Sequence, residues 1–358
     1  MSAAASNAAP ASSRGFAART GPGGISITRH RTDPKVQQEM QQQIQEQLQD
    51  QAEQAGASAS ATPTGQGLGL GGGSRPEHLQ GPELEISKLQ QQVHELWSQN
   101  KIAEAREVAE AVKLTVESFY GDKHPVYASV LNNLALMHKQ VGEFDEAVKS
   151  LSEAIRIYKD TVGDDHLSTV TAMGNLGQLY KTYALNSKGM EKHSLLTHAK
   201  TFFATNMEAL KSLKGEESPD YGMAMQNYGA VLRLLNDKED SMSYVEGGRN
   251  IIVAALDAEH PRVATARNNM GLELKLQGRF ELAEKEYKEA LRIRQAKLGG
   301  SHSETIIAMH NLAELYMAWG KDADAHALQQ QVLDELGVDK VDLEDEIAGD
   351  GSSGSGRS

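Results

Sequence analysis

Residues 124–166, HPVYASVLNNLALMHKQVGEFDEAVKSLSEAIRIYKDTVGDDH, hold one complete structural unit of this chain and the first residue of the next. Apolar residues recur every three or four positions on both sides of Gly142. That spacing places them on one face of a helix, so the stretch predicts two amphipathic helices with a break at Gly142. The polar corner that begins at Gly163 ends the second helix.

The unit repeats with a period of 42 residues, which is visible in a start position and in an asparagine position. The starts are His124, His166, Ser218, His260 and His302. The asparagines are Asn133, Asn175, Asn227, Asn269 and Asn311. The step from His166 to Ser218 is 52 residues, so one unit carries a ten-residue insertion. Repetition at this period indicates a solenoid, in which each unit buries its apolar face against its neighbours, and it favours binding over catalysis.

Composition excludes several classes of protein. The 358 residues include no cysteine, which excludes a disulfide framework, a thiol nucleophile and a cysteine-ligated zinc or iron–sulfur site. No apolar run approaches the length of a membrane span, so we expect no membrane insertion. The formal net charge of −13 disfavours nucleic-acid binding, because phosphate neutralisation needs a basic surface.

The N-terminal segment, residues 1–32, has the composition of an organellar targeting leader. It contains arginines but no acidic residue, and Arg14-Gly15-Phe16-Ala17 resembles a mitochondrial processing site with a cut after Phe16. We therefore predict a mitochondrial location with a cleavable leader. A plastid address and an ordinary N-terminal tail of similar composition remain alternatives.

Residues 33–55 are rich in glutamine and predict a short amphipathic helix. An apolar residue recurs every four positions from Val36 to Ala52, so the helix could pair with a partner helix or with a copy of itself as a coiled coil. The alternative is a partly formed helix in a polar tail. Residues 56–82 are a flexible linker, and the GxGxxG match at 67–72 lacks the flanking strand and helix of a dinucleotide site.

The opposite end of the chain, residues 337–358, is an acidic and then Gly/Ser-rich tail. Residues 334–350 contain eight acids against one base, Lys340. The tail is either a solubilising end or a competitor for a basic binding surface.

The repeated units resemble the tetratricopeptide repeat in the 42-residue form of kinesin light chains and related proteins. The resemblance is carried in the quoted unit by Leu134, Ala135, Gly142, Phe144, Ala147, Leu151 and Ala154. It implies an all-α fold, a right-handed superhelix of about six helix pairs over residues 83–336. The unit at 218–257 departs most, with Asn236 in place of glycine and with Ser241 and Gly248 in place of alanines, so we expect it to keep the fold with looser packing. The insertion fits at the turn near 186–196, because loops accept additions readily.

In this family the asparagine position of the first helix faces a concave groove, and such a ladder grips an extended peptide. A carboxamide suits that task because it offers both a donor and an acceptor. The resemblance therefore predicts peptide binding by the five asparagines. The alternative is that each asparagine bonds the adjacent helix and orders the stack.

A column of cations lies six residues after the asparagines, at the same groove by the family pattern. Its members are Lys139, Lys181, Arg233 and Lys275, followed by Met317. Charge complementarity would then favour an acidic peptide segment. The alternative is a solvated charged row.

The recurrent histidines are predicted to start helices, because ligands one repeat apart at successive corners do not converge on a metal. No catalytic or cofactor motif is present. The sequence thus predicts a non-enzymatic interaction scaffold without cofactor that binds a protein or peptide, as a mitochondrial assembly or stability factor. The runner-up is a cytosolic or ciliary transport adaptor of kinesin-light-chain type.

Overall fold

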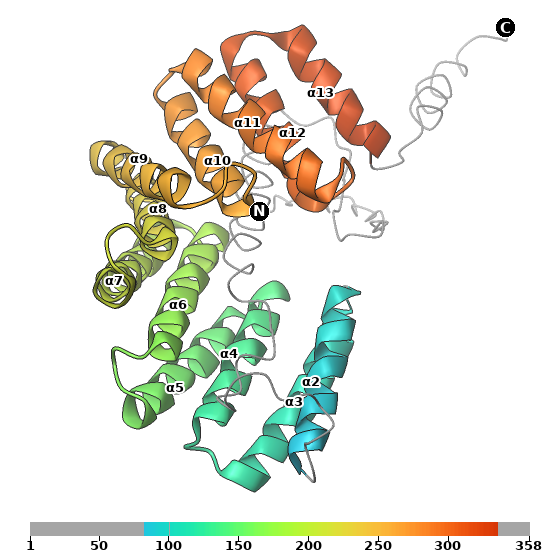
Figure 1. The fold of residues 1–358 in the computed structure, drawn as a ribbon, viewed down its shortest axis with the longest axis vertical. Coiled ribbons are helices and arrows are strands. Elements are labelled where there is room, and N and C mark those ends of the chain that lie inside the picture. Colours follow the sequence, from blue (N-terminus) through green and yellow to red (C-terminus); the bar gives the residue numbers. More distant parts are fainter. Residues whose placement is uncertain (1–81, 100, 336–358) are drawn as a thin grey trace, which may run out of the picture. The chain divides into compact units, whose positions relative to one another are not determined.

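The computed structural model describes residues 82–99 and 101–335, which form helices α2 to α13 joined by short turns (Figure 1). The first helices of the six pairs are α2 (Pro82–Ser98), α4 (Pro125–Gln140), α6 (Leu167–Asn186), α8 (Pro219–Leu234), α10 (Pro261–Leu276) and α12 (Ser303–Trp319). The second helices are α3 (Ile102–Tyr120), α5 (Phe144–Thr161), α7 (Gly189–Lys214), α9 (Lys238–Ala255), α11 (Phe280–Leu298) and α13 (Asp322–Glu335). The prediction of an all-α solenoid of six helix pairs is confirmed. The leader, the glutamine-rich helix and the acidic tail lie outside the described residues.

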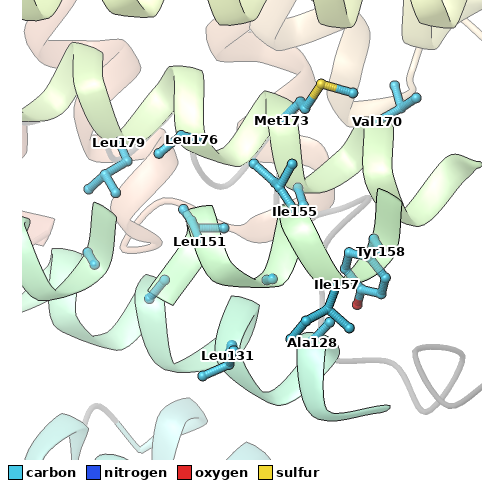
Figure 2. Close-up of a cluster of buried hydrophobic side chains, with 14 residues drawn as sticks. Ala128, Leu131, Leu151, Ile155, Ile157, Tyr158, Val170, Met173, Leu176 and Leu179 are labelled. Carbon is cyan, nitrogen blue, oxygen red and sulfur yellow. The ribbon is translucent and has the colours of Figure 1, made fainter. Parts of the chain in front are cut away.

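Each second helix from α3 to α11 packs both on the first helix of its own pair and on the first helix of the next pair. The core is therefore continuous between pairs. Figure 2 shows one part of it, where Leu131 of α4, Leu151 of α5 and Leu176 of α6 lie among other buried side chains. Burying a leucine of this kind stabilises the fold by roughly 1.5–3 kcal/mol, so the stack depends on contacts between neighbours.

Histidines cap the first helices, as their positions in the sequence predicted. Nδ1 of His124, His166, His260 and His302 accepts the backbone N–H two residues further on, at 3.1–3.2 Å. Ser218 does the same with its hydroxyl, at 3.2 Å. The recurrent histidine is thus a helix N-cap, which satisfies one of the free N–H groups at the start of a helix.

The ten-residue insertion lengthens two helices, and the expected enlarged turn is absent. Helix α6 has 20 residues and α7 has 26, against 16 and 18 in α4 and α5. The extension of α6 is anchored by Tyr183, whose ring stacks on Phe144 at 4.9 Å and whose hydroxyl donates to Asp145. Buried Leu196 and Ala199 give the start of α7 a core of its own, so helical continuation is favoured over a loop.

The unit at 218–257 keeps the fold, but the expectation of looser packing was wrong. Asn236 adopts the left-handed conformation, with φ of 69°, that Gly142 and Gly278 adopt in other units. Glycines let α8 and α9 approach closely, since a Cβ on Gly222 would lie 2.9 Å from the carbonyl oxygen of Gly248. The small residues that break the family pattern therefore allow a tight contact.

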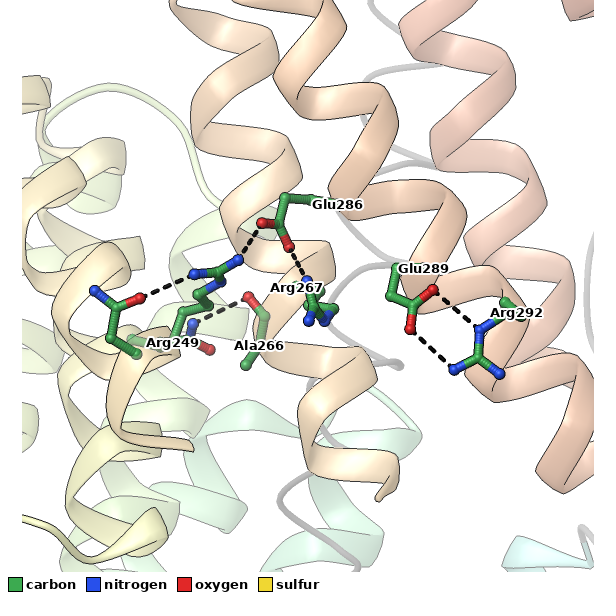
Figure 3. A network of polar contacts seen from close by, with 8 residues as sticks. Arg249, Ala266, Arg267, Glu286, Glu289 and Arg292 are labelled. Atoms are coloured by element: carbon green, nitrogen blue, oxygen red, sulfur yellow. Dashed lines mark hydrogen bonds and ion pairs between the residues drawn. The ribbon is translucent and has the colours of Figure 1, made fainter. Parts of the chain in front are cut away.

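Ion pairs add a second link between pairs. Figure 3 shows Glu286 of α11 between Arg249 of α9 and Arg267 of α10, with Arg267 at 3.0 Å. Because Arg249 belongs to the preceding pair, this carboxylate joins two units. Such half-buried networks fix the register of neighbouring units more than they add stability.

Candidate functional site

The first helices touch one another as well as their own second helices. Contacts join α6 to α8, α8 to α10, and α10 to α12. The asparagine column and the cation column both lie on these helices, so they bring equivalent residues of neighbouring units side by side. We call the surface formed by these two columns, Asn133 to Asn311 and Lys139 to Lys275, the first-helix face.

Three of the five asparagines form hydrogen bonds between units. The Nδ2 atoms of Asn175, Asn269 and Asn311 donate to the side-chain oxygens of Asn132, Gln226 and Asn268, at 2.9, 3.0 and 2.8 Å. In each case the acceptor lies 43 residues earlier, on the first helix of the preceding unit. These bonds have the geometry of the alternative role, in which the asparagine orders the stack.

The remaining two asparagines differ from these. Asn133 and Asn227 are half-buried, and no hydrogen bond joins their carboxamides to another residue in the described ranges. Each therefore keeps a donor and an acceptor for water or a ligand. Peptide binding by the asparagine column stays a prediction, and these two residues fit it with the least rearrangement.

The cation column is partly neutralised by carboxylates that the sequence analysis missed. Nε of Arg233 lies 3.2 Å from Oε1 of Glu273. Burial lowers the pKa of the Lys275 ammonium, and the nearby Glu314 carboxylate partly offsets that effect. Opposite charges thus alternate over α8, α10 and α12. In the other half of the column, Lys139 is half-buried and Lys181 is only 2% exposed.

Several buried polar atoms at this end of the face have no hydrogen-bond partner among the residues that the structure describes. They include Oδ1 of Asn269, Nε2 of His310 and Oε1 of Glu314. Burial lowers the pKa of the His310 imidazole. An unpaired buried polar atom is costly, so a buried water that bonds these three atoms would stabilise this part of the stack.

Two signals in the sequence would have revealed the missed residues. Glu273 stands in a register that is otherwise apolar, and a charge in an apolar column indicates a partner nearby. That register contains Met137, Leu179, Val231 and Leu315. The acceptors Asn132, Gln226 and Asn268 directly precede column asparagines, which was visible as a second amide column.

The described ranges contain neither a cluster of metal ligands nor a helix of membrane-spanning character. Residues 82–99 and 101–335 contain no group of three or more His, Asp or Glu side chains arranged to hold a metal ion. No helix among α2 to α13 is long and apolar enough to cross a membrane.

Comparison with known families identifies the repeat. The tetratricopeptide repeat model matches residues 93–160, 128–184 and 262–334. Together with the helix pairs and their 42-residue period, these matches show that the chain contains tetratricopeptide repeats. Repeats of this class form protein-interaction scaffolds.

Two curated relatives carry similar repeats. Protein KINESIN LIGHT CHAIN-RELATED 3 of Arabidopsis thaliana is 23% identical over 216 residues, which cover 60% of this chain and 32% of that protein. A clustered mitochondria protein homolog of Emericella nidulans is 24% identical over 189 residues, which cover 53% of this chain and 15% of that protein. The chain spans a third or less of the length of these relatives.

A solved structure confirms the fold at low sequence identity. A Rap protein in complex with competence and sporulation factor is 12% identical, with a TM-score of 0.50 over 75% of this chain and 79% of that chain. The likeness concerns the fold alone.

Proposed function

We propose that this chain is a non-enzymatic scaffold whose first-helix face binds an extended peptide of a partner protein. The observation that carries the proposal is the recurrence of carboxamides and cations in register on first helices that touch one another. Carboxamides bond the peptide backbone, which all sequences share, and the cations act on charged side chains. An extended peptide that follows the first-helix face would meet one asparagine and one residue of the cation column in each unit.

The preferred segment carries acidic residues, because four of the five residues in the cation column are basic. Arg233 and Lys275 already have Glu273 and Glu314 nearby, so an acidic ligand competes with these carboxylates. We therefore expect a moderate preference for acid that weakens as salt is added. Pairing of another helix with residues 33–55 would be a separate contact, outside the described residues.

A peptide-display selection against the full-length protein tests this function. Dodecapeptides that bind should be extended and enriched in Asp and Glu, and changing these residues to Asn and Gln should weaken binding measured by fluorescence anisotropy. The matched control for a general charge effect is the double variant Arg233→Glu with Glu273→Lys. It keeps the ion pair and the net charge but exchanges the positions of the two charges. A selection that yields no binder, or binders that ignore the first-helix face, would refute the proposal.

The setting that we propose is the mitochondrion, where the scaffold would act as an assembly or stability factor. The arginine-rich segment 1–32 supports it, and one relative has the word mitochondria in its name. A second candidate, a cytosolic or ciliary transport adaptor, has support from the kinesin-light-chain-related protein. Sequencing the N-terminus of the native protein separates them: a start at Ala17 indicates import and cleavage, and an intact Met1 or acetylated Ser2 indicates the cytosol.

A further inference from the structure

In three helix pairs, an amide on the first helix is followed 22 residues later by a small residue on the second helix. The pairs are Asn132 with Ala154, Gln226 with Gly248, and Asn268 with Ala290. Gly248 shows why the second residue is small, because a Cβ there would lie 2.9 Å from Cγ of Gln226 and closer still to the carbonyl oxygen of Gly222. The small residue makes room for the amide, and the amide accepts the bond from the asparagine of the next unit.

The α6–α7 pair has these two residues exchanged. Gly174 stands on the first helix, in the amide position, and Asn206 stands on the second helix, in the position of the small residue. The two face each other, since a Cβ on Gly174 would lie 3.0 Å from Nδ2 of Asn206. Asn206 is buried, and its Nδ2 donates to the backbone carbonyl of Val170, 2.7 Å away on α6. Its amide is therefore held by its own helix pair.

The exchange removes the acceptor that the next asparagine would use. Asn227 on α8 follows this pair, and it is half-buried without a hydrogen bond to any described residue. Asn269 and Asn311, which follow pairs with the ordinary arrangement, are buried and bonded. The carboxamide of Asn227 is thus open because the amide that would accept its hydrogen bond is missing at Gly174.

We propose that Asn227 binds the backbone of the partner peptide, and that the Gly174–Asn206 exchange keeps it available. Asn175, Asn269 and Asn311 hold the units in register. The inference rests on the proposed function, and it explains why Asn227 is open in the middle of the stack; Asn133, which follows the α2–α3 pair, is open without such an exchange. A free carboxamide bonds both the N–H and the C=O of one peptide unit, whereas a bonded one would first lose its link to the neighbouring helix.

The first test compares affinity with stability in the full-length protein. The probe is the best dodecapeptide from the display selection, labelled with fluorescein. Asn227→Ala should weaken its binding about tenfold, as expected for two lost hydrogen bonds, with an unchanged Tm. Asn311→Ala should lower the Tm while the affinity, measured well below the melt, stays within about twofold. If Asn227→Ala binds normally and Asn311→Ala binds weakly, the assignment is wrong although the proposed function stands.

The second test restores the missing acceptor by copying another unit of this chain. The double variant Gly174→Asn with Asn206→Ala reproduces the Asn132 and Ala154 arrangement, and Asn227 should then bond the new side chain. Its Tm should exceed that of the same variant with Asn227→Ala by about 2–4 °C, and its affinity for the probe should fall at least fivefold. Equal Tm values would refute the explanation of the open carboxamide. A probe that binds equally to every variant would instead refute peptide binding by the asparagines.

Discussion

Removing the hydrogen bond between α12 and α10 should destabilise the protein by an amount that the structure allows us to estimate. Asn311 is 3% exposed, and its Nδ2 donates to Oδ1 of Asn268 at 2.8 Å. Asn268 is itself 1% exposed, so Asn311→Ala leaves a buried oxygen without a donor.

The lost bond contributes about 1 kcal/mol, and the unsatisfied oxygen costs about 1–3 kcal/mol. Alanine offsets about 0.6 kcal/mol through its higher helix propensity. We therefore expect Asn311→Ala to lower the free energy of unfolding by about 2 kcal/mol, which corresponds to a fall in Tm of about 4–8 °C.

Urea denaturation of the full-length protein, followed by circular dichroism at 222 nm, measures this change. Asn227→Ala is the matched control, because it removes the same side chain from the same register on α8, where no bond to a described residue exists. We expect it to change stability by less than about 0.5 kcal/mol. Equal losses in the two variants would show that the hydrogen bonds do not distinguish the asparagines.

Three further predictions concern the corners and the tail. The pKa of His260 is lowered by burial and by Arg262, so the native state binds fewer protons than the unfolded state, and the free energy of unfolding should fall as the pH drops through about 6.5. The variant His260→Asn keeps a capping acceptor. Between pH 7.5 and 5.5 its free energy of unfolding, measured by urea titration, should fall less than that of the unmodified protein. Asn236→Ala should cost about 1 kcal/mol in the same assay, because alanine tolerates a φ of 69° poorly, whereas Asn236→Gly should cost nothing. Deleting residues 338–358 should tighten binding of an acidic dodecapeptide, and 0.5 M salt should remove the gain; identical affinities at low salt would mean that the tail only solubilises.

The fold was predictable because its determinants repeat. A period of 42 residues, helical apolar spacing and a glycine at most turns all indicate helix pairs, and they agree from unit to unit. The N-capping role of the histidines followed from the same register. Local signals of this kind survive in the structure because each unit packs only on its neighbours.

The insertion and the α8–α9 contact were harder to predict because they depend on tertiary packing. Ten extra residues fit a loop as well as a helix until Tyr183 is seen to stack on Phe144. Gly248 indicated loose packing when taken alone, but Gly222 opposes it across the contact. A substitution in one helix has no clear meaning without the residue that faces it.

The sequence predicted on which helices the candidate residues lie, and their role in binding stays a prediction. The asparagine and cation columns lie on the first helices as expected. For Asn175, Asn269 and Asn311 the acceptor is the amide 43 residues earlier, and at Gly174 that amide is replaced by Asn206 from another helix. Pairing of Arg233 with Glu273 likewise joins two units, so neither helix alone reveals it.

Site-specific photocrosslinking tests directly whether the first-helix face holds the partner peptide. Benzoylphenylalanine replaces either Leu276, which follows Lys275 on α10 and is 52% exposed, or Lys288 on α11, whose side chain is 58% exposed. The selected dodecapeptide is added at saturating concentration, and mass spectrometry then measures the fraction of the protein that is crosslinked to it. We expect crosslinks from position 276 and background levels from position 288. Crosslinking from position 288 alone would place the peptide on the second helices and refute binding at the first-helix face.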